Sequence, residues 1–438
     1  QRVGAFQPFD STFTVGNSSL GSASGANFTR GSMSGTTTTW TFSAWVKRSE
    51  PSVGVTDANY VFTIASNAGL AFGGAGTADE VSWYSGSYTG ATNSDLVNDQ
   101  SRWYHVAVKN DGGTGTIYLN GNEVLGSVTV NAADATMAIG SYNGSSNEFD
   151  GYIAEVVFID GSALAPSSFG QVDTSTNRWV PKDVSGLTYD GNSFYLNFAD
   201  SSDLGNDVGG GNKDFTNNSG VLSSTDSPTT NLSVLNPSDS AGGTFSNGNK
   251  TLVTTGSSDK STRATLQLPN SGKFYWETNL NVASSGSIGH VMYLSNDPTL
   301  PLTTNNTGWA DTALLTQDAA GAVKVNGSTL FSFSGAASQN DKYQIAVDLD
   351  NNKMWFGINN SWFNSIGGTD GNPSTGANAM LVQDFSGYIP MFGNYNTNQT
   401  VRFASADWTY TPPTGFVELS QDNLAGTDQF ISAFSWIK

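Results

Sequence analysis

Hydrophobic and polar residues alternate in short runs along most of this chain, and Gly, Asn, Asp and Ser separate the runs. Residues 103–121 and 343–360 show the pattern most clearly, since each contains an alternating run, an Asp/Asn/Gly turn and a second, aromatic-rich run. Tyr104, Val106 and Val108 would share one face of a strand, because side chains two positions apart point to the same side. Asn and Gly at the reversals suit the positive φ angles of tight hairpins. The pattern predicts two β-domains built in a similar way.

Short alternating segments bounded by turn residues are typical of a β-sandwich. In the first part of the chain the predicted strands are 40–47, 60–65, 80–84, 103–109, 116–120, 136–139 and 151–159. In the second part they are 273–280, 289–294, 343–349, 353–358 and 400–403. Only residues 166–169 resemble the start of a short helix. We therefore predict an all-β fold of two tandem antiparallel β-sandwiches.

Shifts in composition divide the chain into four segments. Residues 1–198 form the first predicted sandwich. Residues 199–242 are rich in Asp, Gly, Ser and Thr, and we interpret them as an irregular connector laid over the first domain. The second predicted sandwich covers 243–411 and ends at a Pro-Pro pair. Residues 412–438 form a tail or the start of a further β-module, and because the last residues resemble a strand we expect the parent protein to continue.

Composition and charge exclude several classes of function. The chain of 438 residues is long enough for two or three domains, and only 13% of its residues are charged. A net charge of −19 repels phosphate backbones and anionic lipid head groups, so we expect no nucleic-acid binding. No apolar run approaches the roughly 20 residues that span a bilayer, so we expect no membrane insertion. The absence of Cys excludes disulfides and a cysteine nucleophile.

Four pieces of the first part of the chain resemble the laminin-G-like, concanavalin-A-like lectin family. They are 40–47, 103–121, 139–140 and 149–155, and their order and spacing agree with that family over roughly residues 10–198. The resemblance implies a jelly-roll sandwich that the last of these strands closes. In the second part, residues 272–277 and 343–358 resemble the SPRY sandwich, over about residues 243–411.

The combination of modules resembles virion structural proteins of marine tailed phages. The segments that carry this resemblance are 169–173, 179–182, 194–198, 205–207, 227–231, 410–416, 423–424 and 435–438. It implies a structural protein of a tail fibre, spike or capsid appendage on the exterior surface of the virion. The implied partners are other virion proteins, further copies of the chain (fibres of this class are commonly trimers) and host-surface glycans. The alternative is a secreted or cell-surface lectin-like protein of a marine bacterium.

Candidate catalytic residues are few, so we predict that the chain is not an enzyme. A histidine-based triad would have to use His105 or His290, and His105 lies within an alternating strand. Glycoside hydrolysis needs two carboxylates about 5–10 Å apart across a cleft. The nearest acidic pairs are Asp79 with Glu80, which would diverge on a strand, and Asp348 with Asp350, which run into a turn.

One acidic loop makes calcium the candidate cofactor of this chain. Asp200, Asp203 and Asp207 place several oxygen donors in one loop, although their spacing departs from that of an EF-hand. The same residue types also form solvated turns that bind no metal. Both interpretations remain open from the sequence.

Aromatic residues in loop-like sequence provide the candidate glycan-binding residues, because the C–H faces of sugars stack on aromatic rings. Trp83, Tyr84 and Tyr88 form one such cluster, and Trp362 follows a predicted hairpin. The same residues could instead pack a loop against its sandwich. With few charges nearby, we expect any glycan binding to be weak and nearly insensitive to salt.

Overall fold

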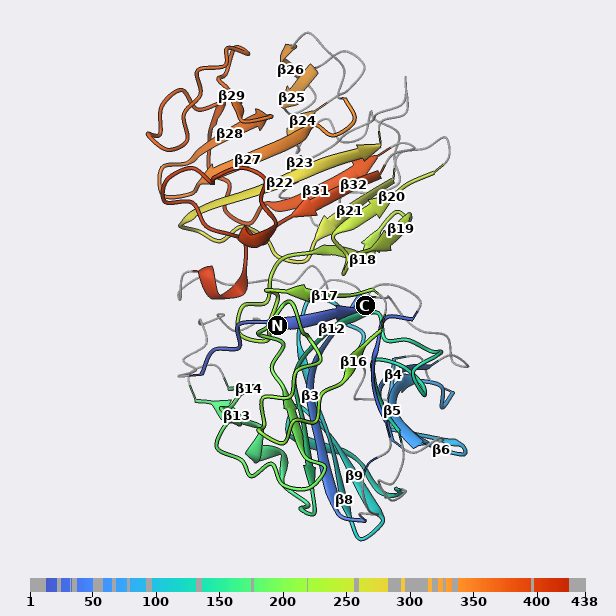
Figure 1. Ribbon diagram of the computed structural model, residues 1–438. Coiled ribbons are helices and arrows are strands. Elements are labelled where there is room, and N and C mark those ends of the chain that lie inside the picture. The colour runs from blue at the N-terminus through green and yellow to red at the C-terminus, as the bar shows by residue number, and fades with distance from the viewer. Residues whose placement is uncertain are drawn as a thin grey trace. The chain divides into compact units, whose positions relative to one another are not determined.

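The computed structural model places the chain in two compact units, which divide between Asn231 and Leu232. We call them the N-terminal unit (to Asn231) and the C-terminal unit (from Leu232), and Figure 1 shows both. The residues that the structure describes are 13–21, 25–31, 33, 38–49, 58–64, 68–76, 79–91, 97–130, 136–174, 177–218, 220–255, 260–282, 293–295, 314–316, 322–325, 328–332, 338–394 and 398–424. None of the helices in these ranges is long and apolar enough to cross a membrane.

Two large antiparallel sheets make up most of the described part of the N-terminal unit. The first has eight strands and the order β10 (Asn122–Thr129), β9 (Thr114–Leu119), β8 (Tyr104–Asp111), β3 (Trp40–Arg48), β12 (Gly151–Asp160), β1 (Ser18–Gly21) and β17 (Val221–Ser224), with β15 (Phe194–Leu196) also paired to β12. The second has seven strands in the order β16 (Thr216–Asn217), β2 (Phe28–Arg30), β11 (Met137–Ile139), β4 (Ala58–Ile64), β5 (Ala68–Gly73), β6 (Val81–Ser85) and β7 (Tyr88–Gly90).

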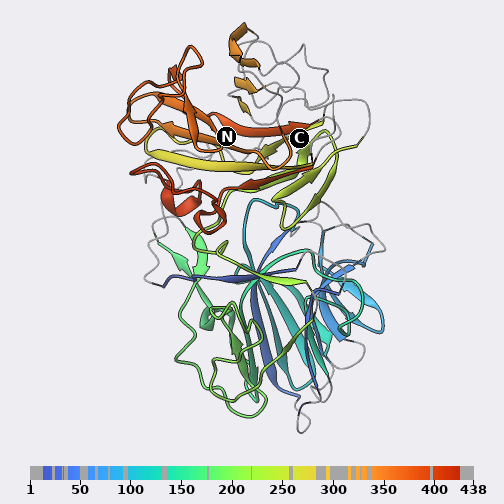
Figure 2. The same ribbon diagram turned by 45° about the horizontal axis from the view of Figure 1, so that its top comes forward.

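Aromatic side chains from both sheets fill the space between them. The ring of Phe42 on β3 stacks on Phe62 of β4 with centroids 4.0 Å apart, and Trp40 contacts both Phe62 and Phe158 of β12. All of these side chains belong to one buried cluster. In Figures 1 and 2 the light-blue strands β4 to β6 stand apart from the long strands β3, β8 and β12. The side chains of this cluster fill the space between them. The arrangement confirms the predicted antiparallel β-sandwich.

A long covering segment, residues 161–189 (described except for 175 and 176), lies over the outer face of the eight-stranded sheet. It contains the 3-10 helix η1 (Pro166–Ser168) and a hairpin of β13 (Gly170–Asp173) and β14 (Arg178–Pro181). Phe169 and Val184 of this segment pack on Val157 and Ile159 of β12. Every residue of β3 is buried, because the core covers one face of the strand and neighbouring segments cover the other.

The C-terminal unit is also all-β. Its largest sheet has the order β19 (Thr244–Ser246), β20 (Thr251–Val253), β32 (Asn398–Arg402), β22 (Lys273–Val282), β27 (Lys342–Asp348), β28 (Lys353–Ile358) and β29 (Ser361–Phe363), with β30 (Leu381–Val382) paired to β28. A four-stranded sheet joins β18 (Leu235–Ser240), β21 (Lys260–Ala264), β31 (Ile389–Asn394) and β23 (Tyr293–Ser295). A three-stranded sheet joins β24 (Leu314–Thr316), β25 (Ala322–Val325) and β26 (Ser328–Ser332), and two 3-10 helices follow, η2 (Ser405–Asp407) and η3 (Gln421–Asn423).

The unit boundaries differ from the predicted ones at 198, 243 and 411. Leu204 and Phe215, from the predicted connector, lie in the core of the N-terminal unit, and β17 pairs with β1. The first unit therefore extends to Asn231. Leu235 and Leu419 lie in the core of the C-terminal unit, so the described part of the predicted tail, 412–424, belongs to that unit. Residues 425–438 lie outside the described residues.

Candidate functional site

Four tyrosines gather on the outer face of the seven-stranded sheet. Tyr84 on β6 lies opposite Tyr88 on β7, and their ring centroids are 4.9 Å apart. Tyr142, from the loop after β11, lies 4.9 Å from Tyr60 of β4 and 5.9 Å from Tyr84. The hydroxyl groups of Tyr60 and Tyr88 are hydrogen-bonded at 2.8 Å. We call these four residues the tyrosine cluster.

Trp83 does not belong to this face, so its assignment to an exposed loop is wrong. It lies within β6, its side chain is 1% exposed, and it packs in the core between the sheets. Its indole Nε1 donates a hydrogen bond to the carbonyl oxygen of Thr129 at 3.0 Å. Successive residues of a strand point to opposite faces, so burial of Trp83 places Tyr84 on the outer face. The structure therefore brings together Tyr84 and Tyr88 of the predicted cluster and separates Trp83 from them.

Small residues make room for the rings of the tyrosine cluster. Ala58 and Ala71 lie beneath them. A Cβ added to Gly74, whose φ is 87°, would come within 2.8 Å of the Tyr88 ring, and one added to Gly69 would come within 2.9 Å of the Tyr60 ring. Tyr60 is buried, whereas the other three rings are partly exposed. The cluster is thus a platform with Tyr60 as its base.

The hydroxyl groups of Tyr60 and Tyr142 stay protonated at neutral pH. Burial, followed by the hydrogen bond with Tyr88, raises the pKa of Tyr60 well above its usual value. Burial and the neighbouring Tyr84 also raise the pKa of Tyr142. A neutral phenol can both donate and accept a hydrogen bond, and this suits the hydroxyl groups of a sugar.

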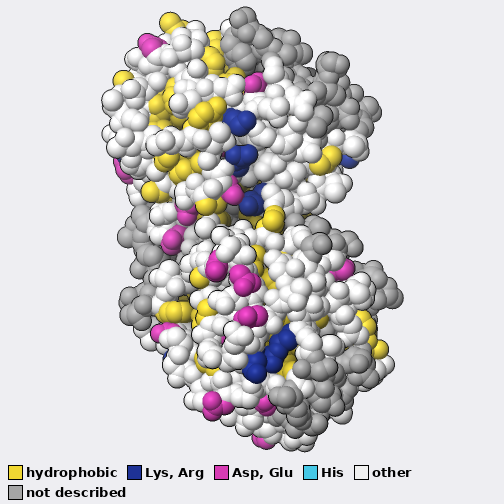
Figure 3. All heavy atoms as spheres, in the orientation of Figure 1, with side chains coloured by type: hydrophobic (Ala, Val, Ile, Leu, Met, Phe, Trp, Pro, Cys, Tyr) yellow, Lys and Arg dark blue, Asp and Glu magenta, His cyan; other side chains and the backbone are white. Residues whose placement is uncertain are grey.

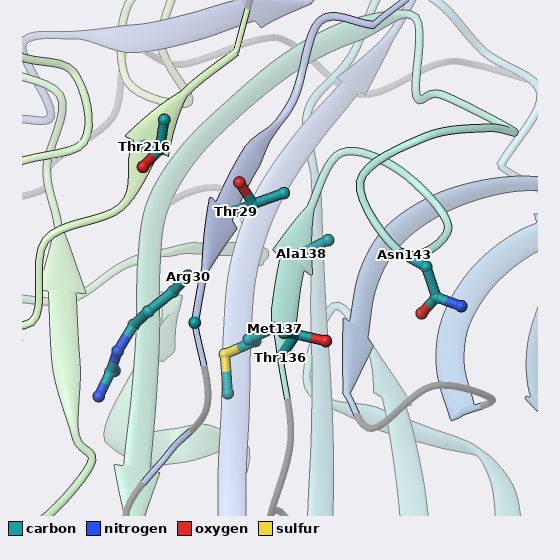
Figure 4. Close-up of a pocket in the computed structure, with 8 residues that line it drawn as sticks. Thr29, Arg30, Thr136, Met137, Ala138, Asn143 and Thr216 are labelled. Atoms are coloured by element: carbon teal, nitrogen blue, oxygen red, sulfur yellow. The ribbon is translucent and has the colours of Figure 1, made fainter.

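A pocket of about 260 Å³ opens near the platform and is lined by Thr29, Arg30, Gly31, Thr136, Met137, Ala138, Asn143 and Thr216. Asn143 follows Tyr142 in the chain, so the two sites share a loop. In Figure 4 the side chain of Arg30 points away from Thr29 and Ala138. The Arg30 guanidinium donates to the carbonyl oxygen of Asn192 at 3.1 Å and lies 5.9 Å from the centre of the Phe194 ring. Hydroxyl and amide groups therefore supply the polar chemistry of this pocket.

Trp362 is engaged in packing within the C-terminal unit. It lies on β29, partly buried, with its ring 6.2 Å from that of Tyr275. It packs against a cluster that contains Trp355 and Phe416. This environment favours a packing role for Trp362, one of the two roles that its sequence allowed, over a role in glycan binding.

The three candidate calcium ligands do not point toward a common centre. Asp200 is exposed and accepts hydrogen bonds from the amide and hydroxyl of Ser202, and these bonds lower the pKa of its carboxyl. Asp203 is exposed. Asp207 is buried and accepts hydrogen bonds from the backbone amides of Tyr195, Gly209 and Lys213 at 2.8 to 2.9 Å. Throughout the described residues, no group of three or more His, Asp or Glu side chains is arranged to hold a metal. Turns and the hydrogen bonds to Asp207 therefore hold the loop in its conformation.

The described candidate catalytic groups are engaged in structural contacts. His105 is fully buried, and its Nε2 lies 2.8 Å from the hydroxyl of Ser43. Burial lowers the pKa of His105 to about 3, so the ring is neutral at physiological pH. Asp79 forms an ion pair with Arg48, and Asp348 forms one with Lys273 at 2.9 Å. His290 lies outside the described residues.

Glu155, the last residue of the segment 149–155 that resembles the lectin family, carries a buried carboxyl group. It lies in β12, where the pairing with β3 shifts register between Ala154 and Val157, and its φ is 50°. The hydroxyl of Tyr195 donates a hydrogen bond to Oε2 of Glu155 at 2.6 Å. Burial raises the pKa of Glu155 to about 7, the bond from Tyr195 opposes the shift, and the charge of Asp183 adds to it. The bulge turns this carboxyl toward the covering segment.

Glu155 should make part of the stability of the chain depend on pH. Its pKa is higher in the folded chain (about 7) than the ordinary value of 4.5, so folding favours the protonated carboxyl. Its contribution is fully present below pH 4.5 and is lost as the pH rises through 7. We expect Glu155→Gln to gain stability relative to the wild type between these limits, by on the order of 3 kcal/mol. Urea unfolding of both proteins across this range measures the difference.

The free energy of unfolding must be compared between the two proteins at each pH, because the titration of His105 changes it in the opposite direction. Its pKa is lowered on folding, so its contribution is lost as the pH falls from 6.5 toward 3. This effect is common to the wild type and Glu155→Gln and cancels. Parallel stability curves for the two proteins would contradict the assignment to Glu155.

Comparison with known proteins places the lectin-like fold in the N-terminal unit. Three solved structures are similar to parts of this chain: a candidate carbohydrate binding protein from Bacteroides ovatus (18% identity, TM-score 0.37, covering 48% of this chain and 60% of that structure), the SPRY domain of human HERC1 (15%, TM-score 0.30, 38% and 96%), and domain 4 of the arabinanase AbnA from Geobacillus stearothermophilus in complex with arabinotriose (21%, TM-score 0.26, 33% and 72%). The search of curated proteins finds no match. Residues 20–167 match the model of the concanavalin A-like lectin/glucanases superfamily.

Proposed function

We propose that this chain is a non-enzymatic carbohydrate-binding protein that holds a neutral glycan on the tyrosine cluster. The observation that carries the proposal is the juxtaposition of three partly exposed tyrosine rings with a pocket lined by hydroxyl and amide groups. Rings that lie on the face of a sheet offer flat apolar surfaces to sugar C–H groups. The pocket beside them offers neutral donors and acceptors to sugar hydroxyl groups.

The electrostatic character of the chain supports a neutral ligand. Arg30 is the charged residue in the pocket lining, and its guanidinium is engaged by Asn192. Figure 3 shows, on the face in view, charged side chains in a few small groups on a surface that is mostly uncharged. Binding without a strong charge complement should depend little on ionic strength. A single shallow site of this kind binds weakly, and repetition on a multivalent particle compensates for the weakness.

Tyr88→Ala should weaken glycan binding without unfolding the N-terminal unit. Tyr88 is partly exposed on the edge strand β7, so its removal leaves the core between the sheets intact. One stacked ring contributes on the order of 1 kcal/mol, and its loss raises Kd about fivefold. Titration of wild type and variant with an oligosaccharide selected on a glycan array, at low and high salt, measures the change.

The matched control is Tyr118→Ala, which removes a partly exposed tyrosine from β9 of the other sheet. It should leave the affinity for the glycan unchanged. Equal losses for the two variants, or binding that high salt abolishes, would contradict the assignment of the tyrosine cluster.

The setting that we propose for this binding is the exterior of a phage virion, in a tail fibre, spike or capsid appendage. The resemblance to virion proteins motivates it, and a cysteine-free, charge-poor chain suits exposed structures. The partners would be other virion proteins and further copies of the chain. Antibody labelling of particles should place the chain on their surface. Unlabelled particles, and neighbouring genes without capsid, portal and tail proteins, would favour the secreted bacterial lectin instead.

A further inference from the structure

A lysine, an asparagine and an aspartate meet in the interior of the N-terminal unit. Lys47 lies near the end of β3, and its Nζ donates hydrogen bonds to Oδ2 of Asp226 at 2.8 Å and to Oδ1 of Asn231 at 2.9 Å. The exposed fractions are 0% for Lys47, 1% for Asp226 and 5% for Asn231. Lysine and aspartate are almost never fully buried without a specific partner, so the site is held together by these contacts.

The surroundings fix all three groups and shield them from the solvent. The indole of Trp103 donates to the second oxygen of Asp226, Oδ1, at 3.1 Å. The ring of Tyr152 lies 5.8 Å from Nζ of Lys47. The side-chain NH2 of Asn231 donates to the carbonyl oxygen of Ser101 at 2.9 Å, and this bond fixes the orientation of the amide. The carbonyl side of the Asn231 amide therefore faces the lysine.

These groups are the ones that formation of an amide bond between side chains requires. The Lys47 amine is the nucleophile, the Asn231 amide is the electrophile, and the Asp226 carboxylate can take up and return a proton. Burial fixes them within hydrogen-bonding distance, and such positioning is what speeds an intramolecular reaction. We propose that Lys47 and Asn231 become joined by an isopeptide bond, formed by the chain itself with release of ammonia.

The reaction balances without any other reagent. Asp226 accepts one proton from the Lys47 ammonium, and the neutral Nζ attacks Cγ of Asn231. The tetrahedral intermediate moves a proton from Nζ to Nδ2, the Cγ–Nδ2 bond breaks, and ammonia leaves. Asp226 returns its proton to the ammonia, so one ammonium ion forms and the Asp226 carboxylate is regenerated. The new bond joins Nζ of Lys47 to Cγ of Asn231.

The bond would link a central strand of the sandwich to the last residue of the N-terminal unit. Asn231 directly precedes the boundary with the C-terminal unit. A cross-link between residues so far apart in the sequence restricts the unfolded chain strongly, as a disulfide does. The chain has no cysteine, so a side-chain amide provides a covalent link that needs no oxidant.

Peptide mapping of the full-length wild-type protein tests the inference without any substitution. The expected result is a branched peptide that joins Lys47 to Asn231, no tryptic cleavage after Lys47, and a mass lower by one ammonia. The branched peptide, and not the intact mass, decides the outcome. Recovery of Lys47 and Asn231 in separate linear peptides from folded protein would overturn the proposal. It would mean that Lys47 and Asp226 form only an ion pair.

Variants separate the roles of the three residues. Asp226→Asn retains the amine and the amide but removes the proton acceptor, and we expect it to abolish the branched peptide. Asn231→Asp should still form the link, with loss of water in place of ammonia. Lys250→Arg is the matched control, because it alters another lysine–aspartate pair, Lys250 with Asp407, and should leave the link intact. A branched peptide at wild-type yield in Asp226→Asn would contradict the role of Asp226.

Discussion

Replacing Asp79 with asparagine should lower the free energy of unfolding of the N-terminal unit by roughly 3–5 kcal/mol. Asp79 is the carboxylate partner of Arg48, and the two side chains are only 8% and 2% exposed. Arg48 also donates to the carbonyl oxygen of Val97 and lies over the ring of Phe72, so it cannot turn out to solvent without losing these contacts. The variant leaves a buried guanidinium without its counter-charge. Asparagine preserves the size of the side chain and tolerates the φ of 62° at this position.

Arg102→Ala provides the contrast for this experiment. Arg102 pairs with Asp99 at 3.2 Å, but its side chain is 54% exposed. An ion pair in that setting contributes less than about 1 kcal/mol. Calorimetry of the full chain should therefore show a large shift of the N-terminal transition for Asp79→Asn and a small one for Arg102→Ala. Equal shifts would mean that burial does not set the strength of these pairs.

A fragment that ends at Asn231 should unfold cooperatively, whereas one that ends at Phe198 should not fold. The shorter fragment lacks β17, the neighbour of β1, and the core side chains of Leu204 and Phe215. It also lacks Asp226, which would leave the fully buried Lys47 without its carboxylate. The combined loss is comparable with the 5–15 kcal/mol by which folded domains are usually stable.

Circular dichroism melting and dye binding distinguish the two fragments. The fragment to Asn231 should melt in one transition and bind little hydrophobic dye. The fragment to Phe198 should aggregate or bind dye strongly, as expanded states with exposed apolar surface do. A sharp melting transition of the shorter fragment at the same temperature would contradict the boundary at Asn231.

Alternation and turn residues were sufficient to predict the fold class and many strands. The predicted strands 40–47 and 353–358 correspond to β3 and β28. The strand β5, residues 68–73, was missed because both of its faces are buried and its small residues show no alternation. Of the predicted strand 289–294, residues 289–292 lie outside the described residues.

The candidate site was predicted in part. Tyr84 and Tyr88 are close in the sequence, so their proximity could be predicted. Tyr60 and Tyr142 are distant in the sequence, and only the pairing of the strands and a loop bring their rings to the cluster. The sequence pattern itself argues against a loop position for Trp83. Residues 80–84 are predicted to be a strand, and alternation within that strand separates Trp83 from Tyr84.

The predicted connector shows why composition alone misplaces a boundary. Its Asp, Gly and Ser residues are typical of loops, and much of the segment is irregular. Its carboxylates nevertheless make specific tertiary contacts. Asp226 binds Lys47 across 179 positions of the sequence, and Asp207 binds backbone amides on both sides of its loop. Nothing in the local pattern of either residue distinguishes a buried partner from a solvated or calcium-binding one.

The position of a bound sugar on the folded chain tests the central claim most directly. A crystal structure of the chain with an oligosaccharide selected on a glycan array would locate it. The account predicts a sugar ring stacked on Tyr84, Tyr88 or Tyr142, with its hydroxyl groups directed toward Asn143 and the neighbouring pocket. A sugar bound only elsewhere, for example beside Trp362 of the C-terminal unit, with the tyrosine cluster unoccupied, would contradict it.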